Sequence, residues 1–262
     1  MSSQGLPARR SARGIDLWSA EWIKFWSLRS TPIGLMLGTA LSLYLAVDNS
    51  RRGILPLTGS HGPLTPEQAA FDGFSWLPAM LGAGLLGTQF VVGEYASGLI
   101  RTTFTAVPDR RRVGAAKIAL LSALTGAGAL VVAACGLVIA LNVVPQPNPA
   151  GTQPLRAVLA SVLALPTCAL IGMALGALLR DAAGAGIGVC ALLGFVPIMV
   201  RPNSNHCLTH VANALPYYSW GRLTAGTGAR GTMPVGTAWA TLAAWVAGSV
   251  FVIVVTLDRR DV

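Results

Sequence analysis

Six long runs of apolar, uncharged residues divide this chain of 262 residues and constrain its fold more than any other feature. A helix needs about 20 such residues to cross the roughly 30 Å of hydrocarbon in a bilayer. Backbone inside lipid must satisfy its own hydrogen bonds, so the runs are expected to be helices. They cover approximately residues 31–47, 74–93, 118–143, 157–179, 183–200 and 236–257. The sequence therefore predicts an all-α integral membrane protein with six transmembrane helices.

The composition agrees with a membrane location. Charged residues make up 11% of the chain and hydrophobic residues 53%, whereas a soluble domain carries about a quarter charged residues. The net charge of +9 would suit nucleic acid, but the basic residues lie between the apolar runs, where they orient a protein in a membrane. We therefore expect a lipid bilayer as partner and no nucleic acid.

The positions of Lys and Arg predict that both termini are cytoplasmic. Cytoplasmic loops carry an excess of these residues. With the N-terminus inside, thirteen of the 19 lie inside, and the outside holds Arg51, Arg52, Arg156, Arg201, Arg222 and Arg230. The even number of spans agrees. The dominance of Arg over Lys, with abundant Ala and Gly, indicates a bacterial protein, so we expect the bacterial cytoplasmic (inner) membrane.

Two different segments precede the transmembrane domain, which we assign to residues 31–262. Residues 1–14 are polar and basic and are expected to be disordered. Residues 15–30 are too polar to span, but they carry apolar side chains that share one helical face, namely Ile15, Trp18, Trp22, Phe25 and Trp26. Asp16, Glu21, Lys24 and Ser27 mostly occupy the rest. This pattern favours an interfacial helix with its Trp rings at headgroup depth; a soluble amphipathic helix packed on a partner is the alternative.

The connection before the last span, residues 201–235, is not plainly hydrophilic. It contains the aromatic stretch V-A-N-A-L-P-Y-Y-S-W-G-R-L, which is too short to cross a bilayer. A re-entrant or interfacial helix on the outer side is favoured over an ordinary external loop. His206, Cys207 and His210 lie in the same connection without a second ligand pair, so a chance cluster is favoured over a metal site.

The glycine patterns do not indicate nucleotide binding. Gly82, Gly84 and Gly87 form G-x-G-x-x-G, but inside a span and with no preceding strand. Small-xxx-small pairs that would allow close helix approach occur at Gly34/Gly38, Gly172/Gly176 and Gly184/Gly188.

No catalytic motif is present. The chain has only two lysines, Lys24 and Lys117, and neither ends a phosphate-binding loop. No His lies in a predicted span, which argues against an intramembrane hydrolase. We therefore expect no enzymatic activity, no metal and no cofactor in this chain.

The segment 94–117 is the most informative stretch, because it combines a carboxylate at the membrane edge, a Pro and a triple Arg. Physically it suits either a short cytoplasmic helix–turn that contacts a soluble partner or an ordinary positively charged loop. It resembles the permease subunits of ABC type-2 exporters, which typically show E-Y-x-x-G-T-I-R and then A-K entering the third span. The matching residues are Glu94, Tyr95, Gly98, Ile100, Arg101, Thr102, Thr103, Pro108, Arg111, Arg112, Ala116 and Lys117. Leu99 departs from the pattern, since Thr is common there.

The resemblance extends, less specifically, over the whole chain, and it implies a function. Two permease subunits, identical or paralogous, would pack together above two copies of a separate ATPase that binds ATP and Mg²⁺. A hydrophobic or amphipathic substrate would move outward. The residues from Glu94 to Arg112 would form the ATPase-coupling segment or inner gate, with Glu94 and Arg101 holding it through polar contacts.

Two other functions remain open at this point. A membrane anchor or sensor with the same fold would move nothing, and the absence of a neighbouring ATPase gene would favour it. An ion-coupled secondary transporter would need no ATPase. The spans lack ionisable residues in their middles, which weakens this last alternative.

Overall fold

The structure, a computed structural model, describes residues 14–27, 30–52, 65–97, 110–144, 153–200, 206–224 and 233–259. Every regular element in these ranges is helical. In chain order they are α1 (Gly14–Ser27), α2 (Ser30–Arg52), α3 (Pro66–Ala70), α4 (Gly73–Ser97), α6 (Arg110–Val143), α7 (Pro154–Leu179), α8 (Ala182–Val189), the π-helical segment η1 (Cys190–Phe195), α9 (Val196–Met199), α10 (His206–Ala214), α11 (Pro216–Thr224) and α12 (Val235–Arg259).

Six segments of the described chain are long and apolar enough to cross a membrane, which confirms the predicted all-α fold with six transmembrane helices. They correspond to α2, α4, α6, α7, the continuous run α8–η1–α9, and α12. The fifth segment changes to π-helix just before Pro197. Proline lacks an N–H and its ring clashes with the carbonyl four residues earlier in a regular α-helix, which accounts for the wider turn at this point.

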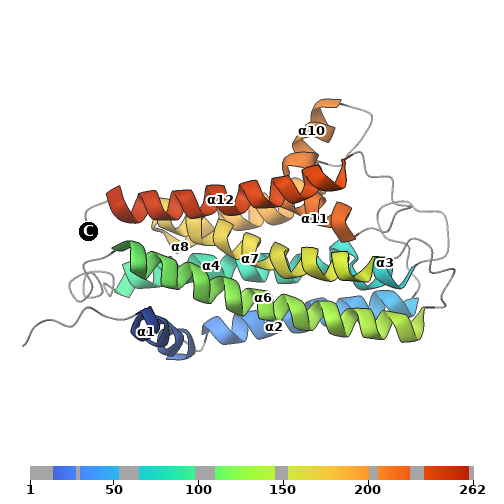
Figure 1. The fold of residues 1–262 in the computed structure, drawn as a ribbon, viewed down its shortest axis with the longest axis horizontal. Coiled ribbons are helices and arrows are strands. Elements are labelled where there is room, and N and C mark those ends of the chain that lie inside the picture. Colours follow the sequence, from blue (N-terminus) through green and yellow to red (C-terminus); the bar gives the residue numbers. More distant parts are fainter. Residues whose placement is uncertain are drawn as a thin grey trace, which may run out of the picture.

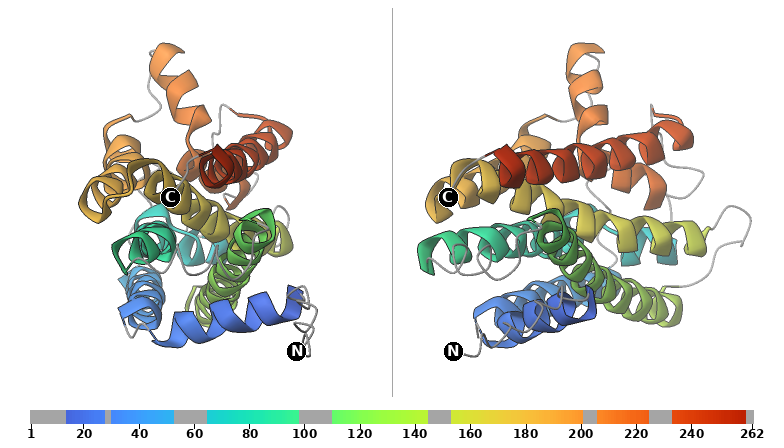
Figure 2. Two further views of the ribbon diagram at one scale, coloured as in Figure 1. Left: turned by 90° about the vertical axis from the view of Figure 1, so that its left-hand side faces the viewer. Right: turned by 60° about the vertical axis from the view of Figure 1, so that its left-hand side comes forward.

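The long helices lie alongside one another, and their ends form two groups (Figure 1). We call these the α1 end, which also contains the last turns of α4 and α12, and the α3 end. The first spanning helix thus begins, and the last one ends, at the same end of the bundle. Helix α10 projects sideways from the bundle (Figure 2).

Helices α4 and α7 form the centre of the bundle. The apolar windows of the segments that contain them are 61% and 67% buried, against 17% for α2 and 22% for α12, so the latter two are the most lipid-exposed spans. A Cβ on Gly87 would clash with the carbonyl oxygen of Ala169, and one on Gly172 would clash with that of Gly84. The Thr88 hydroxyl lies 3.2 Å from the carbonyl oxygens of Gly84 and Gly172 and can donate to either. Glycine is therefore required where these two backbones meet.

The G-x-G-x-x-G pattern in α4 has a packing role toward three neighbours. Gly87 meets α7, as described above. A Cβ on Gly82 would lie 3.7 Å from the Cα of Gly38 in α2, and one on Gly84 would press on Val189 of α8 and Leu193 of η1. Each glycine of the pattern thus admits a different helix to the surface of α4.

The described part of the connection between the fifth and sixth spans contains two short helices, so it is not an ordinary loop, while its predicted re-entrant or interfacial position stays a prediction. Trp220 of α11 is 1% exposed, its ring lies 5.4 Å from that of Trp76, and its indole N–H donates to the Ser161 hydroxyl of α7 over 2.9 Å. The Tyr218 hydroxyl donates to the carbonyl of Pro197 in α9 over 2.8 Å. These contacts fix α11 to the α3 end of the bundle.

Replacing Gly172 by Ala should test the α4–α7 contact. The added methyl would force the two backbones apart, and overpacking of this kind costs about 1–3 kcal/mol. Gly34→Ala is the matched control, because a Cβ at Gly34 meets nothing within 4 Å. Thermal unfolding in detergent micelles should show a lower midpoint for Gly172→Ala alone; equal midpoints would contradict the contact.

Candidate functional site

The residues predicted to couple to an ATPase flank the connection between α4 and α6. Tyr95 lies in the last turns of α4 and Arg112 in the first turn of α6, both at the α1 end. The other predicted residues lie outside the described residues or have side chains outside them; they are Glu94, Gly98, Arg101, Thr102, Pro108 and Arg111. The structure therefore places the two ends of the predicted segment but not its middle.

Helix α1 lies across the direction of the spans, beside the start of α6 (Figure 2). Trp18, Trp22 and Trp26 are 38%, 42% and 49% exposed, and they follow one another at four-residue spacing on one face. This crosswise placement with outward indole rings is typical of a helix in the membrane interface.

Phe25 shares the predicted face with the Trp residues, since its ring centroid lies 6.5 Å from that of Trp22 and 5.5 Å from that of Trp26, but it is only 5% exposed. One residue of α1 departs from the expected pattern. Glu21, which the sequence placed among the polar residues, is 4% exposed and lies one turn before Phe25 on the same inward side. Glu21 is buried because it has a polar partner on another helix.

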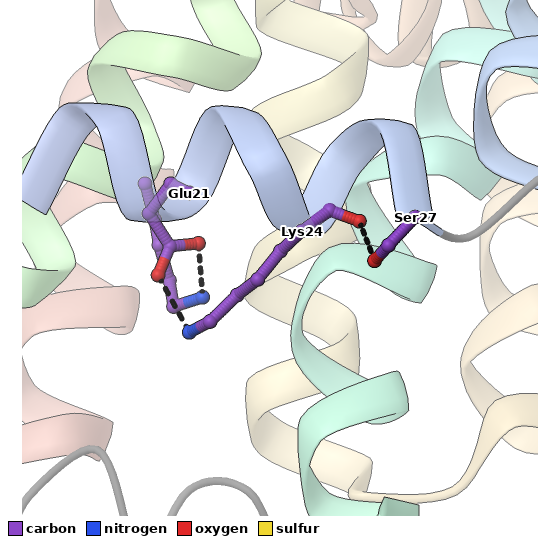
Figure 3. A network of polar contacts seen from close by, with 4 residues as sticks. Glu21, Lys24 and Ser27 are labelled. Carbon is purple, nitrogen blue, oxygen red and sulfur yellow. Dashed lines mark hydrogen bonds and ion pairs between the residues drawn. The ribbon is translucent and has the colours of Figure 1, made fainter.

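That partner is Lys117 of α6. Its Nζ donates to Glu21 Oε2 over 2.7 Å, and the Nζ of Lys24 donates to Glu21 Oε1 over 2.9 Å. Figure 3 shows the Glu21 carboxylate and the Lys24 side chain converging below α1, with Ser27 at the end of the helix. We call Glu21, Lys24 and Lys117 the charge junction.

Burial decides which of the two ion pairs matters more. The side chains of Glu21 and Lys117 are each 6% exposed, whereas that of Lys24 is 31% exposed. Removing one member of a buried pair costs about 3–5 kcal/mol, because a buried charge loses its compensation, while an exposed pair contributes about 0–1 kcal/mol. The Glu21–Lys117 pair, which joins α1 to α6, therefore matters more than the Glu21–Lys24 pair within α1.

Aromatic side chains extend the charge junction to α4. The Phe25 ring centroid lies 6.2 Å from that of Phe90, and Lys117 Nζ lies 5.9 Å from the Phe90 centroid. A cation at this distance over an aromatic face is attracted by the ring. Helices α1, α4 and α6 thus meet at one place.

A second cation–π contact lies nearer the end of α4. The guanidinium carbon of Arg180 is 5.0 Å from the Tyr95 ring centroid. Arg180 ends α7 with φ 54°, in the left-handed region, and Asp181 starts α8 by accepting the Gly184 N–H over 2.6 Å. This two-residue turn holds Arg180 against the helix that leads into the predicted coupling segment.

The predicted His206–His210 cluster begins α10 instead of lying in a loop. Cys207 and His210 are exposed there. Among the side chains that the structure describes, no group of three or more His, Cys, Asp or Glu could hold a metal ion.

No protein-family model and no curated protein matches this chain. The candidate site is therefore defined by its geometry, in which α1 meets the last turns of α4 and the first turns of α6.

Tryptophan fluorescence should show whether α1 lies in the interface. In vesicles of brominated lipid, replacing Trp18, Trp22 and Trp26 together by Phe should remove much of the lipid-dependent quenching, because these rings are exposed. The matched control replaces Trp76 and Trp220, which are 0% and 1% exposed, and should leave the quenching nearly unchanged. Undiminished quenching in the triple variant would contradict the interfacial position of α1.

Proposed function

We propose that this chain is the transmembrane permease subunit of an ATP-driven ABC exporter in the bacterial cytoplasmic membrane, with both termini in the cytoplasm. It pairs with a second permease, identical or paralogous, and with two copies of an ATPase subunit that binds ATP and Mg²⁺. The complex moves a hydrophobic or amphipathic substrate outward. The membrane-spanning fold is common to this proposal and to its alternatives, so only the contacts at the α1 end distinguish them.

The observation that carries the proposal is the anchoring of both sides of the α4–α6 connection. Phe90 and Tyr95, near the end of α4, contact Lys117 and Arg180, and Lys117 is itself bound to Glu21 of α1. Because the end of α4 and the start of α6 are held in this way, a push from a soluble partner on the residues between them can be passed to the spans. A merely topogenic loop needs no such base.

The positions of buried charge support an external energy source. The buried charged residues of the described chain are Glu21, Glu67, Asp72 and Lys117, and all lie near one end of the bundle or the other. Proton relays and counter-ions of ion-coupled carriers are usually buried within the spans. Hydroxyl groups such as those of Ser42 and Thr88 are the buried polar groups nearer the centre, and both bind backbone atoms.

The decisive experiment is co-purification with an ATPase. The chain is co-expressed with an ABC ATPase encoded beside it and isolated from membranes by a tag on one partner. We expect a stable complex whose ATP hydrolysis needs both proteins. Failure to associate with any such ATPase would leave the anchor or the secondary transporter as the better interpretation.

Alanine at Glu94 or at Arg101 should lower export several-fold while leaving membrane insertion intact, because both residues are proposed to hold the coupling segment through polar contacts. Arg51→Ala is the matched control, since Arg51 is an exposed basic residue at the opposite end of the bundle. ATP-driven uptake into inverted vesicles of equal protein content measures the effect, because the cytoplasmic face of such vesicles is outside. Unchanged export in both variants would contradict the assigned roles.

A further inference from the structure

We propose that Glu21 is a positioning residue that fixes α1 to the start of α6, so that the interfacial helix, the last turns of α4 and the first turns of α6 move as one body during export. This inference rests on the proposed function for its role in export, but the contact itself does not. The role of Glu21 is inferred from its contacts in the charge junction.

Lysine is rare in this chain and occurs only at the charge junction. Of its 19 basic residues only two are lysines, Lys24 and Lys117. Their positions are 93 residues apart in the sequence, yet both ammonium groups bind the same carboxylate, at 2.9 and 2.7 Å. A chain that otherwise uses arginine thus has lysine only at this junction.

The chemistry of the site explains that choice. Lysine carries its charge on a compact ammonium group with three rotatable donors, whereas arginine presents a planar fork. Lys117 is buried, with Nζ held between Glu21 and the ring of Phe90. Two cations that converge on one carboxylate in so enclosed a place are accommodated more readily as ammonium groups than as two guanidinium planes.

Lys117 lies where it can join α1 to both α4 and α6. It lies two turns after the start of α6. The Phe90 ring beside it belongs to α4, the helix that precedes α6 in the structure. Phe25 adds an apolar contact from α1 to the same ring. The helices on both sides of the connection are therefore attached to α1.

Buried charge also makes the attachment all-or-none. Sliding α1 away from α6 would separate Glu21 from Lys117 while both remained shielded from water, and a small displacement would gain no new hydrogen bonds in return. The contact thus has a docked and an undocked state with little between them. A docked α1 moves with the start of α6.

Amine labelling tests the contact without any reference to transport, because the chain has only these two lysines. Purified protein in lipid nanodiscs is treated with an N-hydroxysuccinimide ester, and labelling of the two lysine peptides is followed by mass spectrometry. In the wild type, Lys117 should react far more slowly than Lys24. Glu21→Gln should speed the labelling of Lys117 by about tenfold or more, since reaction of a protected group follows the population of its open state.

Ser27→Ala is the matched control for labelling. It removes a hydrogen bond from the same helix, that of the Ser27 hydroxyl to the Lys24 carbonyl at 2.8 Å, but removes no charge. It should leave the protection of Lys117 as in the wild type. Equal protection of Lys117 in the wild type and in Glu21→Gln would overturn the charge junction.

Export per ATP hydrolysed tests the positioning role in the reconstituted complex with its ATPase. Glu21→Gln should lower this ratio, whereas loss of folded protein alone would lower export and hydrolysis together. The exchange variant Glu21→Lys with Lys117→Glu keeps one carboxylate between two ammonium groups and should restore the ratio, and the lysine introduced at position 21 should be protected from labelling. Lys117→Glu alone should not restore the ratio.

The two experiments separate the two ideas. A gain in labelling with an unchanged export-to-hydrolysis ratio would overturn the positioning role and leave the contact standing. If no ATPase complex exports any substrate, the proposed function fails, and the labelling result still decides whether Glu21 fixes α1 to α6.

Discussion

The close approach of α4 and α7 is the constraint on which the rest of the structure depends. Gly87 and Gly172 leave no room for a side chain where the two backbones meet, and Thr88 lies within hydrogen-bonding distance of a carbonyl of each helix. Lipid provides no hydrophobic force between helices, so such packing and hydrogen bonding must hold them together. The other four spans surround this pair, and those with the least burial, α2 and α12, present their apolar surfaces to the membrane.

Different interactions hold the two ends of the bundle. At the α3 end, hydrogen bonds connect α11 to its neighbours, among them those of Trp220 to Ser161, of Tyr218 to Pro197 and of the Arg156 guanidinium to the Leu223 carbonyl. At the α1 end, an ion pair and two cation–π contacts hold α1, α4, α6 and the turn after α7. Charged contacts are the more sensitive to displacement, because a separated buried charge has no water to replace its partner.

Much of the fold was predictable because a bilayer imposes a simple rule on spans, namely about 20 apolar residues each. The burial of Phe25 and Glu21 was not predictable, since the pattern of one helix shows which residues share a face but not which other helix that face contacts. The Glu21–Lys24 pair was visible as an i, i+3 spacing, but the contact with Lys117 joins residues 96 positions apart. Likewise, the pattern of Gly82, Gly84 and Gly87 could be excluded as a nucleotide site from the sequence, but only the fold shows that these glycines admit neighbouring helices.

These contacts together determine where movement can occur. The α4–α7 pair resists sliding, because Gly84 and Gly172 are in direct backbone contact and any shift would bring side chains into the gap. The charge junction attaches α1 to α6 beside the end of α4. Helices that cannot shear past one another must tilt together, so a displacement at the α1 end would be passed along α4 and α7 to the α3 end. There α11 is bound to α7 by the Trp220–Ser161 and Arg156–Leu223 hydrogen bonds and to α9 by the Tyr218–Pro197 hydrogen bond.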